Sequence, residues 1–119
     1  MGPIEIRRVY DEAEDGEGAV FLVDRMWPRG VRKADLKIDG WLRDVAPSSD
    51  LRQWFGHRAE RFAEFAERYR RELDERPEAE RPLLEAAEKG PVTLLYSARD
   101  TEHNQAVVLR DHLRDRLGG

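Results

Sequence analysis

Side chains that could bind an anion gather in one segment of this 119-residue chain. Residues 25–37 contain five basic residues and one acidic residue. Guanidinium groups bind phosphate or carboxylate through paired hydrogen bonds, so this segment favours an anionic ligand. Arg25 and Arg29 flank Trp27 in the string Val-Asp-Arg-Met-Trp-Pro-Arg-Gly. We predict that Arg25 and Arg29 bind the anion and that Trp27 offers a stacking surface.

A second group of polar side chains lies near the carboxyl terminus of the chain. Ser97 and Arg99 are expected to add contacts to the same anion, beside the free N–H groups of a following helix. His103 is expected in the first turn of that helix, where the helix dipole favours a neutral imidazole suited to proton transfer. Asp24 or Asp100 would then orient a substrate or accept a proton.

Several kinds of chemistry are excluded or disfavoured. The chain has no cysteine, which excludes disulfides, thiolate metal sites and cysteine nucleophiles. No two histidines have a metal-ligand spacing, and the common nucleotide-binding and hydrolase motifs are missing, so neither a metal nor a cofactor is expected. His57 is expected to pack or cap, and His112 to be exposed.

Apolar patterns predict the elements that position these side chains. Segments 4–9 and 19–24 are rich in β-branched residues and predict strands. Segment 92–97 is a nearly continuous apolar run, typical of a strand covered on both faces. Aromatic and leucine side chains recur every three or four residues along 58–75 and predict a long helix. Further helices are predicted at 38–45, at 50–55 with a cap at Ser48 or Ser49, from Pro82 to Lys89, and after a cap at Asp100 or Thr101.

This order of elements predicts one α/β domain over residues 1–119, with a small, mainly parallel sheet of about three strands and helices packed on it. The long helical segment before 92–97 requires a right-handed crossover and parallel pairing with 19–24. Strands 4–9 and 19–24 could form a hairpin or run parallel. Ligands bind beyond the carboxyl ends of parallel strands, so the loops after 19–24 and 92–97 should face one crevice.

The charge balance narrows the classes of partner. Charged residues form 39% of the chain, but the net charge is −4, which disfavours general nucleic-acid binding. Segment 11–17 is acidic, opposite in sign to 25–37. No apolar run reaches the ~20 residues of a membrane span, and residues 1–20 have no signal-peptide pattern, so we expect a cytoplasmic protein without a membrane partner. The sequence leaves the oligomeric state undetermined.

Three stretches together carry a family resemblance: Val23–Gly30, Ala46–His57 and Thr93–Asp100 with His103-Asn104 behind it. With them the chain, from about Ile6 to Leu117, resembles the YeaO-like branch of the bacterial domain-of-unknown-function 488 family. The resemblance implies a compact α/β domain of unassigned activity, with its first two strands parallel. Longer relatives carry a Cys-His-Arg motif after the last strand, and this chain has Glu102-His103-Asn104 there.

Three functions remain in competition. The first is an enzyme acting on a small phosphate-bearing or nucleotide-like substrate. The second is a non-catalytic module that binds a nucleotide or nucleic acid. The third is an interaction protein whose motifs are purely structural. A concave pocket holding a carboxylate or histidine with a perturbed pKa would favour the enzyme. A flat basic patch with an exposed tryptophan would favour the binding module. A tight network around Asp24 without a cleft would favour the interaction protein.

Overall fold

The computed structural model describes residues 2–13 and 16–118, so Glu14 and Asp15 of the acidic segment lie outside the described residues. Within these ranges the chain forms one parallel sheet with the strand order β1-β4-β2-β3. The four strands are β1 (Ile4–Arg8), β2 (Ala19–Leu22), β3 (Gly40–Trp41) and β4 (Val92–Tyr96). The predicted α/β class and parallel sheet are confirmed, with one strand more than the three expected.

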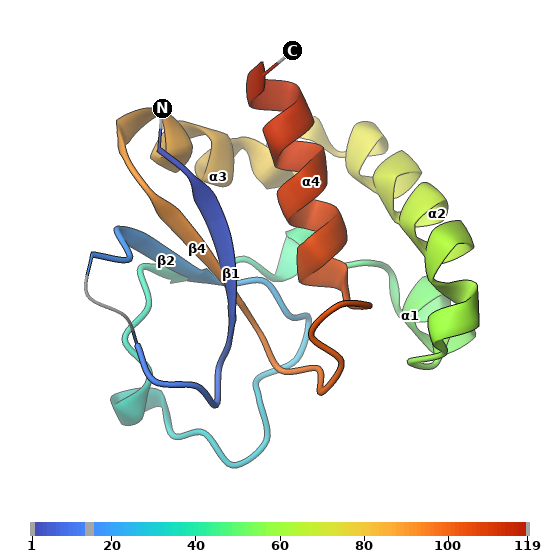
Figure 1. The fold of residues 1–119 in the computed structure, drawn as a ribbon, viewed down its shortest axis with the longest axis horizontal. Helices are drawn as coiled ribbons and strands as arrows, with labels where there is room; N and C mark the ends of the chain where they lie inside the picture. Colours follow the sequence, from blue (N-terminus) through green and yellow to red (C-terminus); the bar gives the residue numbers. More distant parts are fainter. Residues whose placement is uncertain (1, 14–15, 119) are drawn as a thin grey trace.

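The α-helices of the described residues pack together on one face of the sheet. They are α1 (Ser49–Phe55), α2 (Phe62–Glu75), α3 (Pro77–Lys89) and α4 (Gln105–Gly118). Short 3-10 turns are η1 (Lys33–Asp35), η2 (Arg43–Val45) and η3 (Ala59–Arg61). Figure 1 shows α2 beside α4, with the two chain ends at the same end of the molecule. The opposite end of the sheet holds the loop after β2.

The first two strands run parallel, which is one of the two expected arrangements, but they do not pair with each other. β4 lies between β1 and β2 and pairs parallel with both, in a register that aligns Leu94 with Ile6 on one side and Phe21 on the other. The end of β1 and the start of β2 therefore lie at opposite ends of the sheet. β1 and β2 point the same way without touching as neighbours.

The central strand β4 is buried along its whole length, as its apolar run predicts. Val92, Leu94 and Tyr96 join the core under the helices. Leu95 faces the other way, where it packs with Val9, Val20 and Leu22. That second face is covered by apolar side chains of the loop after β2 and of β3. They are Trp27, Val31, Leu36, Ile38 and Trp41.

The predicted helix over 38–45 is wrong. Asp39 N donates to Val20 O at 2.7 Å and Gly40 pairs with Phe21, which makes this segment the edge of the sheet. Gly40 weakens a helix, and pairing with β2 supplies backbone partners that a short isolated helix would have to find in itself. Helix α3 also begins earlier than expected, at Pro77, and Pro82 lies inside it.

The prediction that His112 is exposed is also wrong. His112 on α4 is buried, and its Nε2 lies 2.8 Å from Oε2 of the buried Glu80 on α3. The other oxygen of Glu80 forms an ion pair with Arg116, whose Nε lies 2.7 Å away. Helix periodicity identifies the face of α4 that turns inward only approximately, and a polar residue at its border can be buried when another element supplies its partner.

Gly18 is required by both its backbone angle and its neighbours. Its φ is +72°, and a Cβ there would lie 2.2 Å from the carbonyl oxygen of Pro91. We expect Gly18→Ala to lower the free energy of unfolding by at least about 2 kcal/mol, because the clash with Pro91 adds to left-handed strain, which alone costs about 1–3 kcal/mol. Urea denaturation measures this loss. Gly30→Ala is the matched control, with φ +79° and open space at the Cβ position; equal losses in both variants would contradict the steric argument.

Candidate functional site

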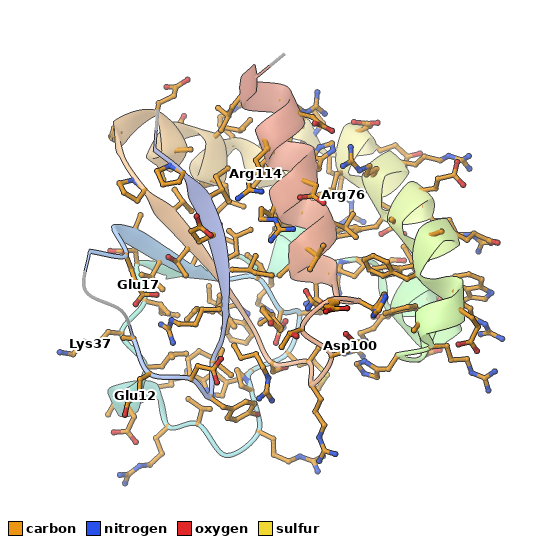
Figure 2. All side chains as sticks on the ribbon, viewed as in Figure 1. Glu12, Glu17, Lys37, Arg76, Asp100 and Arg114 are labelled. Atoms are coloured by element: carbon orange, nitrogen blue, oxygen red, sulfur yellow. The ribbon has the colours of Figure 1, made fainter. Side chains whose placement is uncertain are left out.

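A pocket of about 230 Å³ lies at the carboxyl edge of the sheet, between the loop after β2, helix α1 and the start of α4. Figure 2 labels Asp100 at the turn just before α4, near this edge. The pocket is lined by Tyr10, Asp24, Arg25, Met26, Trp27, Pro28, Arg29, Pro47, Arg52, Phe55, His57, Phe65, Ser97, Ala98, Asn104 and Gln105.

The loop after β2 is held to the sheet by its aromatic side chains. Trp27 Nε1 donates to Val31 O at 2.6 Å, and Trp41 Nε1 donates to Asp24 O at 2.7 Å. The two indoles meet edge to face, with ring centroids 5.3 Å apart. Tyr10 adds a hydrogen bond of 2.9 Å from its hydroxyl to Arg29 O. These contacts fix the backbone that carries the pocket arginines.

Asp24 lies at the buried end of the pocket and is 6% exposed. Its Oδ2 accepts hydrogen bonds from Ser97 N at 3.0 Å and from Ser97 Oγ at 2.6 Å, and its Oδ1 accepts one from Gln105 Nε2. Burial raises the pKa of Asp24, although these hydrogen bonds act in the opposite direction. Asp24 therefore joins the ends of β2 and β4 to the start of α4.

Basic side chains surround the outer part of the pocket. Arg25 is anchored by a hydrogen bond of 3.2 Å from its Nε to Pro47 O. Arg29 from the loop and Arg52 from α1 are exposed. His57 follows Gly56, and both have positive φ, so the chain turns sharply at the end of α1 and brings the imidazole to the pocket. These groups give the outer part of the pocket a positive character when they are charged.

His103 and Asp100 form a pair of their own beside this pocket. His103 Nδ1 lies 3.0 Å from Asp100 Oδ2, and the imidazole meets the ring of Phe62 edge on. Asp100 Oδ1 also accepts from Glu102 N and His103 N, each at 2.9 Å, and these hydrogen bonds lower the pKa of Asp100. Neither residue lines the pocket.

The expected start of the last helix is wrong. Helix α4 begins at Gln105, so His103 precedes its first turn. Asn104 caps it instead of Asp100 or Thr101, with Oδ1 accepting from Val107 N at 3.1 Å. Asp100 is engaged with the turn over 100–103, which leaves the helix end to the next suitable side chain.

The structure brings together five of the residues that the sequence singled out: Asp24, Arg25, Trp27, Arg29 and Ser97 all line the pocket. Arg99, like Asp100 and His103, does not. Arg52, His57 and Gln105 also line the pocket, and the sequence did not single them out as binding residues. Arg52 and His57 stand in the second family-like stretch, which is the signal that could have identified them. The roles of all these residues stay predictions.

Residues 2–13 and 16–118 contain neither a metal-binding cluster nor a membrane-spanning helix. These residues contain no group of three or more His, Asp or Glu side chains arranged to hold a metal ion. No helix among them combines the length and the apolar character needed to cross a membrane.

The fold and the pocket define a small α/β protein with a parallel sheet and a pocket at its carboxyl edge that has basic side chains around its mouth. The chain belongs to the DUF488-N3i family, described as the inactive DUF488-N3 subclade, whose sequence model matches residues 3–118. This match confirms the resemblance to the domain-of-unknown-function 488 family.

Relatives of similar length cover almost the whole chain. The uncharacterized protein YeaO of Escherichia coli K12 is 45% identical over 111 residues, which span 93% of this chain and 96% of YeaO. The uncharacterized protein Rv3073c of Mycobacterium tuberculosis H37Rv is 39% identical over 113 residues, 95% of each chain. No solved structure matches the chain.

Proposed function

We propose that this protein is a non-catalytic module that binds a small phosphate-bearing molecule in the pocket at the carboxyl edge of the sheet. The observation that carries the proposal is the convergence on one pocket of Arg25 and Arg29 from the loop after β2 and Arg52 from α1. Guanidinium groups are the side chains best suited to hold a phosphate through paired hydrogen bonds.

Binding without catalysis is favoured by how the acid–base candidates are engaged. Both oxygens of Asp24 accept hydrogen bonds from Ser97 or Gln105. The hydroxyl of Ser97 is thus engaged as a hydrogen-bond donor to Asp24. The Asp100–His103 pair stands outside the pocket lining. The description of the family as an inactive subclade agrees with this proposal.

The size of the pocket favours a small ligand. Its volume of about 230 Å³ is below the ~300–1,000 Å³ of most small-molecule sites. A phosphate monoester of a small metabolite fits such a volume. The base of a nucleotide would have to lie outside the pocket, against its outer rim. Met26, with 62% of its surface exposed, and Tyr10, with 48%, provide apolar surface there.

Calorimetric titration with inorganic phosphate and small phosphate monoesters tests the proposal. Each charge-assisted hydrogen bond contributes about 1.5–3 kcal/mol, so Arg25→Ala, Arg29→Ala or Arg52→Ala should each weaken binding about 10-fold or more. Arg81→Ala, at an exposed arginine on α3 outside the pocket lining, should leave the affinity unchanged. Failure of every phosphate ligand to bind, or affinities indifferent to all three pocket variants, would reject the proposal.

The second candidate function is an enzyme acting on a phosphate-bearing or nucleotide-like substrate. The Asp100–His103 contact favours it, because a carboxylate at Nδ1 orients an imidazole so that Nε2 can accept a proton. In this case the ligand identified by titration would be converted to product, and His103→Ala would abolish the conversion while leaving ligand affinity intact.

A further inference from the structure

The pocket contains a carboxylate at its buried end and basic groups at its mouth. Asp24 is almost fully buried, whereas Arg29, Arg52 and His57 are exposed. A simple phosphate would satisfy the basic groups but would bring a second negative charge toward Asp24. A ligand with charges of both signs would complement both ends of the pocket.

We infer that the pocket selects small phosphate monoesters that also carry an ammonium group, with the ammonium directed to Asp24 and the phosphate to the arginines. This inference rests on the proposed function, since it specifies the class of ligand for the same pocket. It adds Asp24, at the buried end of the pocket, as the residue that recognises the ammonium, while the arginines at the mouth bind the phosphate.

Asp24 retains capacity for another hydrogen bond. A carboxylate has about four acceptor positions on its two oxygens. Among the described residues, Oδ2 accepts two hydrogen bonds, both from Ser97, and Oδ1 accepts one, from Gln105. An ammonium group has three donors and no acceptor, which makes it a suitable partner for the remaining position on Oδ1.

The surroundings of Asp24 favour a cation over a neutral donor. Burial destabilises the ionised carboxylate, and none of the donors that Ser97 and Gln105 supply carries a charge. The charge of Arg52, an exposed side chain, lowers the pKa of Asp24 less than any of these hydrogen bonds does. Phe55 and Phe65, both buried, line the same pocket, and aromatic rings attract cations. A ligand ammonium would thus supply the positive charge that the buried end of the pocket lacks.

A pair of isosteric ligands tests the inference on the unmodified protein. Phosphoethanolamine and n-propyl phosphate differ mainly in an ammonium group that replaces a methyl group. Calorimetric titration should find phosphoethanolamine about 10-fold or more tighter, as expected for one charge-assisted hydrogen bond. Asp24→Asn keeps the side-chain shape and should reduce this preference to about 3-fold or less. Asp35→Asn, the same change at an exposed position in the loop after β2, should preserve it.

The outcomes separate this inference from the proposed function. Equal affinities of the unmodified protein for the two ligands would overturn the inference alone, because phosphate binding itself would stand. A preference that persists in Asp24→Asn, with the variant folded by thermal denaturation, would also overturn it. Failure of both ligands to bind would overturn the proposed function and this inference together. The comparison on the unmodified protein decides the matter even if Asp24→Asn does not fold.

Discussion

Glu80→Ala is expected to lower the free energy of unfolding by about 3–5 kcal/mol, because it removes a buried carboxylate that contacts both His112 and Arg116. Glu80 is 2% exposed, and its two oxygens contact His112 and Arg116 on α4. The substitution removes these two polar contacts, which join α3 to α4, and leaves His112 buried without its carboxylate partner. Urea denaturation followed by circular dichroism measures the loss.

The control for this prediction is Glu78→Ala, an exposed residue in the first turn of the same helix. Surface substitutions of this kind usually change stability by less than about 0.5 kcal/mol. A similar small change for Glu80→Ala would contradict the role of the Glu80 network. Replacing Glu80 and His112 together by leucine should cost less than Glu80→Ala, because no buried polar group is then left without its partner.

Phe65→Ala is expected to cost about 3–5 kcal/mol, as large-to-small changes of buried phenylalanine do. Phe65 is 1% exposed, stacks on Phe55 with ring centroids 4.3 Å apart, and lies 5.8 Å from the ring of Tyr69. Because small domains have only about 5–15 kcal/mol of net stability, this variant should be close to unfolding at physiological temperature. Urea or thermal denaturation tests the prediction.

Phe62→Ala provides the matched comparison for Phe65→Ala. Phe62 lies on the same helix and belongs to the same apolar stripe, but it is only partly buried. Its loss should therefore be clearly smaller. A cost below ~1 kcal/mol for Phe65→Ala would show that the stripe of α2 does not form the core.

Patterns that depend on near neighbours in the chain predict much of this fold. The spacing of Phe65, Tyr69 and Leu73 identifies the buried face of α2, and all three are buried. The apolar run of β4 predicts a strand with both faces covered. The helical crossover before β4 predicts its parallel pairing with β2, which is confirmed.

Contacts across the sheet edge and between helices do not follow from such patterns. β3 is a two-residue strand, too short to carry an alternation, and its backbone partners come from β2. The pairing of Glu80 with His112 joins positions 32 residues apart, and nothing in the local sequence of either helix indicates the partner. Both cases depend on the packing of whole elements.

The residues of the candidate pocket also fall into those that the sequence predicts and those that only tertiary packing brings there. The sequence by itself determined that Asp24, Arg25 and Arg29 follow one strand and Ser97 another, and parallel strands must present those loops at one edge. Only the tertiary structure decided that Arg52 and His57 join them, because α1 must first pack beside the loop after β2. It also decided that Asp100 pairs with His103 outside the pocket. Strand direction follows from chain connectivity, whereas the meeting of a helix end with a loop depends on side chains from several elements filling one core.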